Sequence, residues 1–279
     1  MPGLINAHTH LFSQGKPLNP KLATPKGQRM VATFAHSPLG KPYMAATVKH
    51  NATTLLESGV TTIRTLGDVG YEVVTLRDQI DAGQILGPRI LASGPLMAIP
   101  EGHGAPLIAL TSGTPEEART AVAQNLKAGV NAIKIAATGI TDIQLENSKN
   151  VVGGMVSGAR QAHEAGLMIG VGTDTGMTFV PQYATWRELE LLVAYAGFSP
   201  AEALHAATAV NASILGVDAE TGSLEVGKSA DLLVLNANPL DDLRALEHPA
   251  LVIAASRPVW RPDPKRFADI DALLDEAYD

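Results

Sequence analysis

Short apolar runs alternate with Ala-rich, helix-patterned segments along most of the chain. The runs consist of β-branched and aliphatic residues, which is typical of strands in a buried sheet. The segments between them repeat apolar residues every three to four positions, as amphipathic helices do. We therefore expect strands at 4–7, 60–65, 89–93, 130–136 and 167–172, and helices at 49–58, 73–82, 115–128, 158–165, 188–196 and 200–209.

Several of these helices end at a glycine that directly precedes the next strand. The phrases are SGVTTIR, AGVNAIKI and AGLMIGVGTD. The repeated strand–helix order indicates parallel βαβ units, in which chemistry gathers at the carboxyl ends of the strands. His8, His10, Lys134 and Asp174 all lie at or near predicted strand ends.

The last third of the chain has a different pattern. Residues 221–228 carry turn glycines, and apolar runs at 232–235 and 251–255 predict two short strands. This part predicts a small β appendage rather than another βα unit. Residues 264–279 predict an acidic amphipathic helix.

Composition narrows the function classes. The net charge of −7 and the lack of a basic run argue against nucleic acid and anionic membranes as partners. No apolar stretch approaches the roughly 20 residues of a membrane span, and the N-terminus lacks the pattern of a signal peptide. The chain has no cysteine, which excludes disulfides and thiolate metal sites and is compatible with a reducing cytosol. We expect a cytoplasmic protein.

The stretch PGLINAHTHL holds the first candidate site. In an extended strand His8 and His10 point to the same face, so their imidazoles converge. Neutral imidazole is the commonest metal ligand in proteins, and zinc takes several such ligands. A His-x-His pair alone also fits surface or satisfied core histidines.

The same stretch resembles the first barrel strand of the amidohydrolase superfamily of metal-dependent hydrolases. VTTIRTLGDVG, GPRILASGP with the following GHG, NAIKIAATG and VGTDTG resemble the second, third, fourth and eighth strands with their loops. The segments WRELELLVAYAGFSPAEALHAATAVNASILGV and GSLEVGKSADLLVLNANPL resemble the tail of the prolidase-like and imidazolonepropionase-like branch. The resemblance implies an α/β fold of the TIM-barrel-like (β/α) type with a small C-terminal β domain.

The resemblance also implies roles for individual residues. His8 and His10 correspond to ligands of the first metal, and Lys134 to a lysine that CO2 converts to a bridging carbamate. Asp174 corresponds to a metal ligand that doubles as the general base on water. His103 lies in the loop after the third strand and is a candidate to face the substrate. Structural roles stay open for the same residues. Lys134 could pair with an acid at the rim of the barrel, Asp174 could be a helix cap or turn residue, and His103 could stabilise its loop.

The chain departs from the family pattern between its fourth and eighth strands. Only 39 residues lie between Lys134 and Asp174, and a βαβ unit needs roughly 30 or more. The fifth to seventh strands, two of which carry metal-binding histidines in the family, are therefore expected to be missing. His163 lies in this interval, but in a helical segment. We place the junction near 138–142, and we also expect the β appendage to lack its usual partner before the first strand.

These observations give the following expectations. Residues 1–215 form a partial barrel, 216–262 a remnant of a β-sandwich domain, and 263–279 a C-terminal helix. The family reaction is hydrolysis of an amide-type C–N bond in a dipeptide, an N-acyl amino acid or a cyclic amide. At most one divalent metal, zinc by family, is expected. The rivals are an inactive remnant and an unrelated α/β binding protein, and a homo-oligomer stays open.

Overall fold

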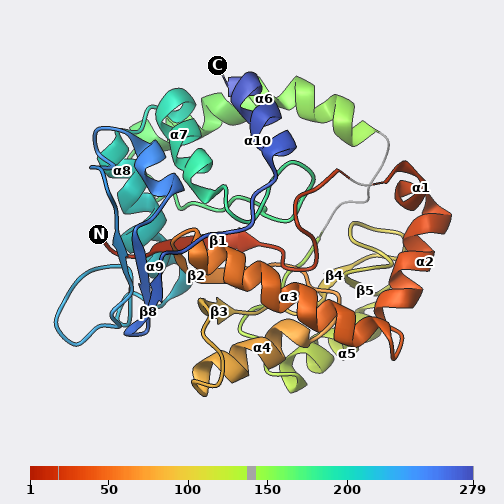
Figure 1. The fold of residues 1–279 in the computed structure, drawn as a ribbon. Helices are drawn as coiled ribbons and strands as arrows, with labels where there is room; N and C mark the ends of the chain where they lie inside the picture. The colour runs from red at the N-terminus through yellow and green to blue at the C-terminus, as the bar shows by residue number, and fades with distance from the viewer. Residues whose placement is uncertain (18, 137–142, 279) are drawn as a thin grey trace.

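A parallel sheet lies at the centre of the computed structural model, which describes residues 1–17, 19–136 and 143–278 (Figure 1). β1 (Leu4–Thr9), β2 (Val60–Thr65) and β3 (Arg89–Leu91) pair in this order, all parallel. β4 (Leu96–Ala98) and β5 (Ala109–Thr111) form a second parallel pair. The predicted α/β class and the first three predicted strands are confirmed.

Two irregular segments, one beside each of these parallel sheets, lie where regular strands were expected. Residues 171–175 run parallel to β1 and residues 131–136 run beside β4, each with an isolated bridge. The prediction of regular strands at 130–136 and 167–172 is therefore wrong. Backbone bonds from Ala7 N to Val171 O at 2.9 Å and from His10 N to Thr175 O at 2.7 Å join residues 171–175 to β1. The Asn211 side chain adds to this pairing, because it accepts from Val171 N at 3.0 Å and donates to Ile5 O at 2.6 Å.

Helices pack against the sheet and continue around it. α3 runs beside β2 and contacts α4, and α6 contacts α7, where Arg160 donates to Tyr195 O at 2.8 Å (Figure 1). The helices are α1 (Pro20–Ala23), α2 (Pro25–Ala35), α3 (Gly40–Glu57), α4 (Glu72–Asp81), α5 (Pro115–Lys127), α6 (Ile143–Glu164), α7 (Thr185–Ala196), α8 (Pro200–His205), α9 (Asn211–Leu215) and α10 (Ala268–Tyr278). A π-helical segment, Ala206–Val210, joins α8 to α9, and Leu243–Glu247 is a 3-10 helix.

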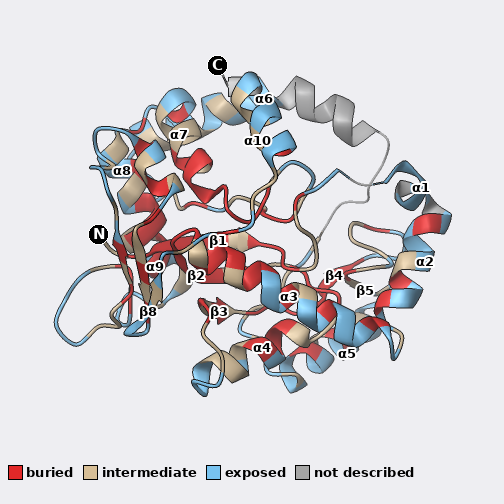
Figure 2. Ribbon diagram, viewed as in Figure 1, coloured by how far each residue is buried: buried red, intermediate tan, exposed pale blue. Residues whose placement is uncertain are grey.

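The core lies between the sheet and the inner faces of these helices. Figure 2 shows the buried residues concentrated in β1, β2 and the sheet-facing side of α3. Leu4, Leu55 and Ile63 are fully buried there. Burying one such side chain is worth roughly 1.5–3 kcal/mol, so this layer holds the strand ends in fixed positions.

A second sheet forms at the end of the chain. β6 (Leu232–Val234), β7 (Leu251–Ala254) and β8 (Arg257–Trp260) are antiparallel. Its β6 edge is covered by the N-terminus, because Met1 N donates to Leu233 O at 3.0 Å and Leu233 N donates to Met1 O at 2.9 Å. A small antiparallel sheet thus occupies the region of the predicted β appendage and is joined to the start of β1, whereas the division into domains stays a prediction.

The expected junction at 138–142 lies outside the described residues. Within the described ranges, no backbone hydrogen bond joins the two outer segments of the parallel sheet, 131–136 and 171–175. The internal deletion and the incompleteness of the barrel stay predictions. None of the described helices is long and apolar enough to cross a membrane.

Candidate metal centre

His8 and His10 converge on one carboxylate, as the extended spacing predicts. Asp174 Oδ1 lies 3.3 Å from His8 Nε2 and 2.9 Å from His10 Nε2. The two imidazole rings meet edge to face with centroids 5.3 Å apart. One ligand atom from each of the three residues falls within 4.8 Å of the others. This spacing places the three ligand atoms around a volume suited to a single cation.

The hydrogen bond on the far side of His10 fixes its tautomer. His10 Nδ1 lies 2.9 Å from Gly67 O, in a buried position. A carbonyl oxygen only accepts, so Nδ1 carries the proton and Nε2 of the neutral ring carries a lone pair. That lone pair faces a carboxylate oxygen, which also only accepts. The lone pair and the carboxylate oxygen repel each other unless a cation lies between them or His10 carries a second proton. Metal-bound histidines commonly donate an outer hydrogen bond of the kind that His10 makes to Gly67 O.

Asp174 is held against β1 by its own backbone. Its N–H donates to His8 O at 3.0 Å, and its φ of 57° is in the left-handed region. Asp tolerates this conformation better than most residues. The side chain therefore turns toward the histidines rather than capping a helix. Gly176 follows at φ 99°, where an added Cβ would lie 2.5 Å from His10 O.

Asn6 ties the two ligand-bearing segments together. Its Nδ2 donates to Thr173 Oγ1 at 2.8 Å and to Thr185 Oγ1 at 3.2 Å. Its Oδ1 accepts from His8 N at 3.2 Å and from Thr173 N at 3.3 Å. Asn6 is fully buried, so these bonds fix the relative position of β1 and the Asp174 segment.

Burial and charge set the protonation of the cluster. Burial lowers the pKa of His8 to about 4, although the nearby charge of Asp174 acts in the opposite direction. Burial alone would raise the pKa of Asp174, but when His10 carries its second proton, its hydrogen bond and its charge bring that pKa below the usual value. At neutral pH, His8 is thus an uncharged ligand and Asp174 a carboxylate.

Lys134 and His103 share the electrostatic environment of the cluster. The charge of Lys134 contributes to lowering the pKa of His8, Asp174 and His103. Burial is the main cause of the lowered pKa of His103, which also responds to Asp174. Within the described part of the chain, Lys134 has no acid within 4.0 Å of its ammonium group. The alternative of an acid-paired rim lysine therefore lacks support.

His163 lies away from this cluster. Its ring stacks on Phe198 with centroids 4.0 Å apart, and its Nε2 lies 3.5 Å from Glu202. The sequence interpretation of His163 as a helical residue is confirmed. By contrast, sequence reasoning missed Asn6 and Gly67. Asn6 lies two residues before His8 and so points to the same side of the strand, a pattern from which its role could have been predicted. The role of Gly67 rests on its backbone oxygen, which has no signature in the sequence.

Comparison with known proteins supports the same family. A profile of the amidohydrolase family matches residues 1–152 and 144–259. The chain belongs to the amidohydrolase family. Among curated members, the imidazolonepropionase of Symbiobacterium thermophilum is 41% identical over 78 residues, which is 28% of this chain. The ochratoxinase of Aspergillus niger is 39% identical over 92 residues, which is 33% of this chain. Each alignment spans only 18% of the relative's length.

Solved structures extend the comparison to nearly the whole chain. A protein from Bifidobacterium longum with a provisional prolidase assignment is 66% identical, with a TM-score of 0.85, covering 100% of this chain and 85% of that one. A Xaa-Pro dipeptidase with bound methionine has a TM-score of 0.73 at 22% identity, covering 93% and 86%. The second likeness is one of fold alone.

Proposed function

We propose that this amidohydrolase-family chain is a metal-dependent hydrolase that cleaves an amide-type C–N bond with water. The observation that carries the proposal is the convergence of His8, His10 and Asp174, with the His10 lone pair directed at a carboxylate oxygen. An enzyme that holds no cation there would leave this repulsion uncompensated unless His10 were doubly protonated.

The donor set fits a divalent metal. Two imidazole nitrogens and one carboxylate oxygen are ligands that zinc accepts, and the three-ligand set leaves room for substrate. His8, His10 and Asp174 would hold the ion, and we propose Lys134 as a further ligand after carboxylation. When bound, the metal supplies Lewis acidity toward water and toward the amide carbonyl.

The residues themselves supply the proton transfer and the charge of the site. Asp174 is ionised at neutral pH and its side chain is 50% exposed, so its second oxygen can accept a proton from water. Arg64 donates from Nε to Ala7 O at 2.9 Å, and its charge contributes to lowering the pKa of His8. We propose that this guanidinium and the half-buried His103 face the carboxylate or carbonyl of the substrate.

The proposed substrate is a dipeptide, an N-acyl amino acid or a cyclic amide. The similarity to an imidazolonepropionase and an ochratoxinase, and the likeness in fold to a Xaa-Pro dipeptidase, support this small-molecule range without choosing within it. We further propose that the protein works in the cytoplasm and has the three-part division at residues 1–215, 216–262 and 263–279.

The test is hydrolysis by zinc-supplemented protein of a panel of Xaa-Pro dipeptides, N-acyl amino acids and cyclic amides. We expect turnover that is lost in His8→Ala, His10→Ala and Asp174→Asn. His50→Ala is the matched control, because His50 is exposed on α3. Turnover that survives all three site substitutions would contradict the proposal.

One observation favours a second candidate, an inactive remnant of the same family. Within the described residues, the cluster contains two histidines and one aspartate, and His163 is engaged with Phe198 and Glu202. The family match in two pieces, meeting at 144–152, supports the predicted internal deletion. This candidate predicts a protein that binds metal at His8 and His10 but hydrolyses no member of the panel.

A further inference from the structure

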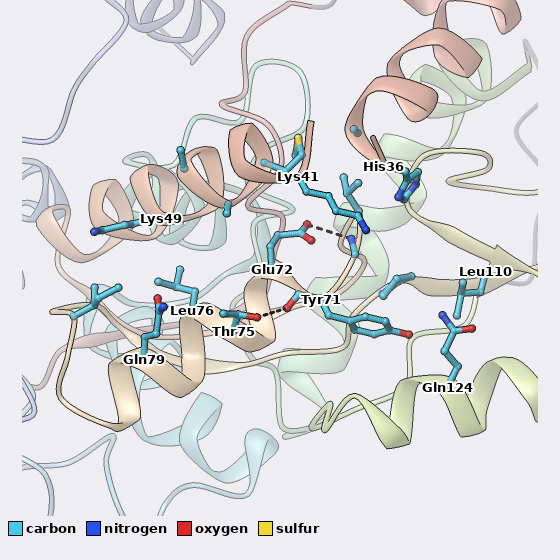
Figure 3. A pocket seen from close by; sticks show the side chains of 18 residues that line it. His36, Lys41, Lys49, Tyr71, Glu72, Thr75, Leu76, Gln79, Leu110 and Gln124 are labelled. Carbon is cyan, nitrogen blue, oxygen red and sulfur yellow. Dashed lines mark hydrogen bonds between the residues drawn. The ribbon is translucent and has the colours of Figure 1, made fainter. Parts of the chain in front are cut away.

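A groove of about 890 Å³ opens between α3 and α4, apart from the metal centre (Figure 3). Its floor is apolar, and the buried side chains there include Ala35, Met44, Val69 and Leu76. None of the proposed metal ligands lines it. Its volume falls within the roughly 300–1,000 Å³ that small-molecule sites occupy.

Two ammonium groups stand along the α3 side of this groove. Lys41 and Lys49 are both exposed and both line it (Figure 3). They lie two turns apart on one helix, which separates their Cα atoms by about 12 Å along the axis. Among the described residues, neither lysine has a carboxylate within 4.0 Å or a side-chain hydrogen bond. Both charges are therefore available to a ligand.

The acid in the groove is already engaged. Glu72 Oε1 accepts from Gly70 N at 3.2 Å, and Glu72 lies in the first turn of α4, where the helix dipole favours a negative charge. Tyr71 OH donates to Asn125 Oδ1 at 2.8 Å. The other ionisable group that lines the groove is His36, at its far end from Lys49 (Figure 3). The groove thus offers an apolar floor, two unpaired cations and one compensated anion.

We propose that the α3–α4 groove is a binding site for a small organic carboxylate with an apolar body. The apolar body would cover Met44, Val69 and Leu76, and the carboxylate would pair with Lys41 or Lys49. Ammonium groups bind carboxylates as point charges without fixed geometry, which suits ligands of varied shape. A cationic ligand of the same shape would meet two like charges. This site is independent of the hydrolytic function proposed above.

The test is isothermal titration of the full chain with sodium octanoate below its micelle concentration. We expect saturable binding at one site per chain, weakened by added salt because the lysines are exposed. Octylammonium chloride has the same chain with the opposite charge, and we expect it to bind at least tenfold more weakly. Equal binding of the two probes would overturn the assignment of the groove to anions, as would the lack of saturable octanoate binding.

Variants locate the site. Lys41→Gln with Lys49→Gln should weaken octanoate binding at least tenfold, while Lys21→Gln with Lys26→Gln, two exposed lysines outside the groove, should leave it unchanged. Ala45→Trp places an indole in the groove from an exposed position on α3 and should abolish binding. Thermal unfolding confirms that each variant is folded. Unchanged binding in the double Lys41/Lys49 variant or in folded Ala45→Trp would overturn the proposal.

Discussion

Asn211 is the buried side chain that supplements the irregular backbone pairing beside β1. Its Nδ2 donates to Ile5 O at 2.6 Å and to Val171 O at 2.8 Å, and its Oδ1 accepts from Val171 N at 3.0 Å. Asn211→Ala removes all three bonds in a site that water does not reach. Val171 O keeps a bond from Ala7 N, so Val171 N loses its partner outright and Ile5 O loses one.

Leaving a buried polar group unpaired costs about 1–3 kcal/mol, so Asn211→Ala should lower the free energy of unfolding by about 3 kcal/mol. Urea unfolding followed by circular dichroism measures it. Asn238→Ala is the matched control, because the Asn238 side chain bonds Asp241 and Leu240 in an exposed loop; a surface loss of this kind should cost within about 0.5 kcal/mol. If Asn211→Ala were as mild as this control, the backbone bonds alone would hold the Asp174 segment to β1, and the reasoning on Asn211 would be refuted.

Three further predictions concern the surroundings of the metal centre. Gly176→Ala should destabilise the chain by at least about 1 kcal/mol more than Gly166→Ala, since both glycines have positive φ but only Gly176 would clash with His10 O; equal costs in urea unfolding would contradict this. Burial raises the pKa of Asp68 to about 7 from its ordinary 3.8. The stability that the protonated Asp68 carboxyl contributes is therefore present below pH 3.8 and lost as pH rises toward 7. The unfolding free energy of Asp68→Asn, measured across this pH range, should lack the decline seen in the unsubstituted protein. Ser93 Oγ accepts from Gly67 N at 3.0 Å and so helps to position Gly67 O, the partner of His10 Nδ1. Loss of a direct hydrogen bond to a metal ligand commonly costs about tenfold or more in affinity, and we expect Ser93→Ala, one bond further out, to weaken zinc affinity in a chelator competition by less than about tenfold; unchanged affinity would argue against this role.

The sequence was most informative where a side-chain pattern and a backbone period agree. The alternation of His8 and His10 predicts that both point to one place, and the structure brings both to Asp174. The helix-patterned segments likewise appear as helices, because their apolar faces have a sheet to cover. These elements depend on local periodicity, which the sequence carries directly.

The sequence was least informative where a distant side chain supplements irregular backbone pairing. The run around Lys134 looks like a strand, but its only strand-type bridge joins Met97 to Ile135, at the margin of the described sheet. The segment before Asp174 is paired with β1 by backbone bonds and by Asn211, whose partner Val171 lies 40 residues earlier in the chain. Likewise, the acceptor that fixes the His10 tautomer is the backbone oxygen of Gly67. Such partners depend on tertiary contacts and leave no periodic signal.

The most direct test of the metal centre is elemental analysis of monodisperse protein purified without chelators. We expect about one divalent ion per chain, bound with the number of ligands that is usual for zinc. We expect this ion to be lost in His8→Ala and in His10→Ala but kept in the exposed control His50→Ala. A chain that binds no ion, or one that keeps its ion when His8 and His10 are both replaced, would contradict this expectation.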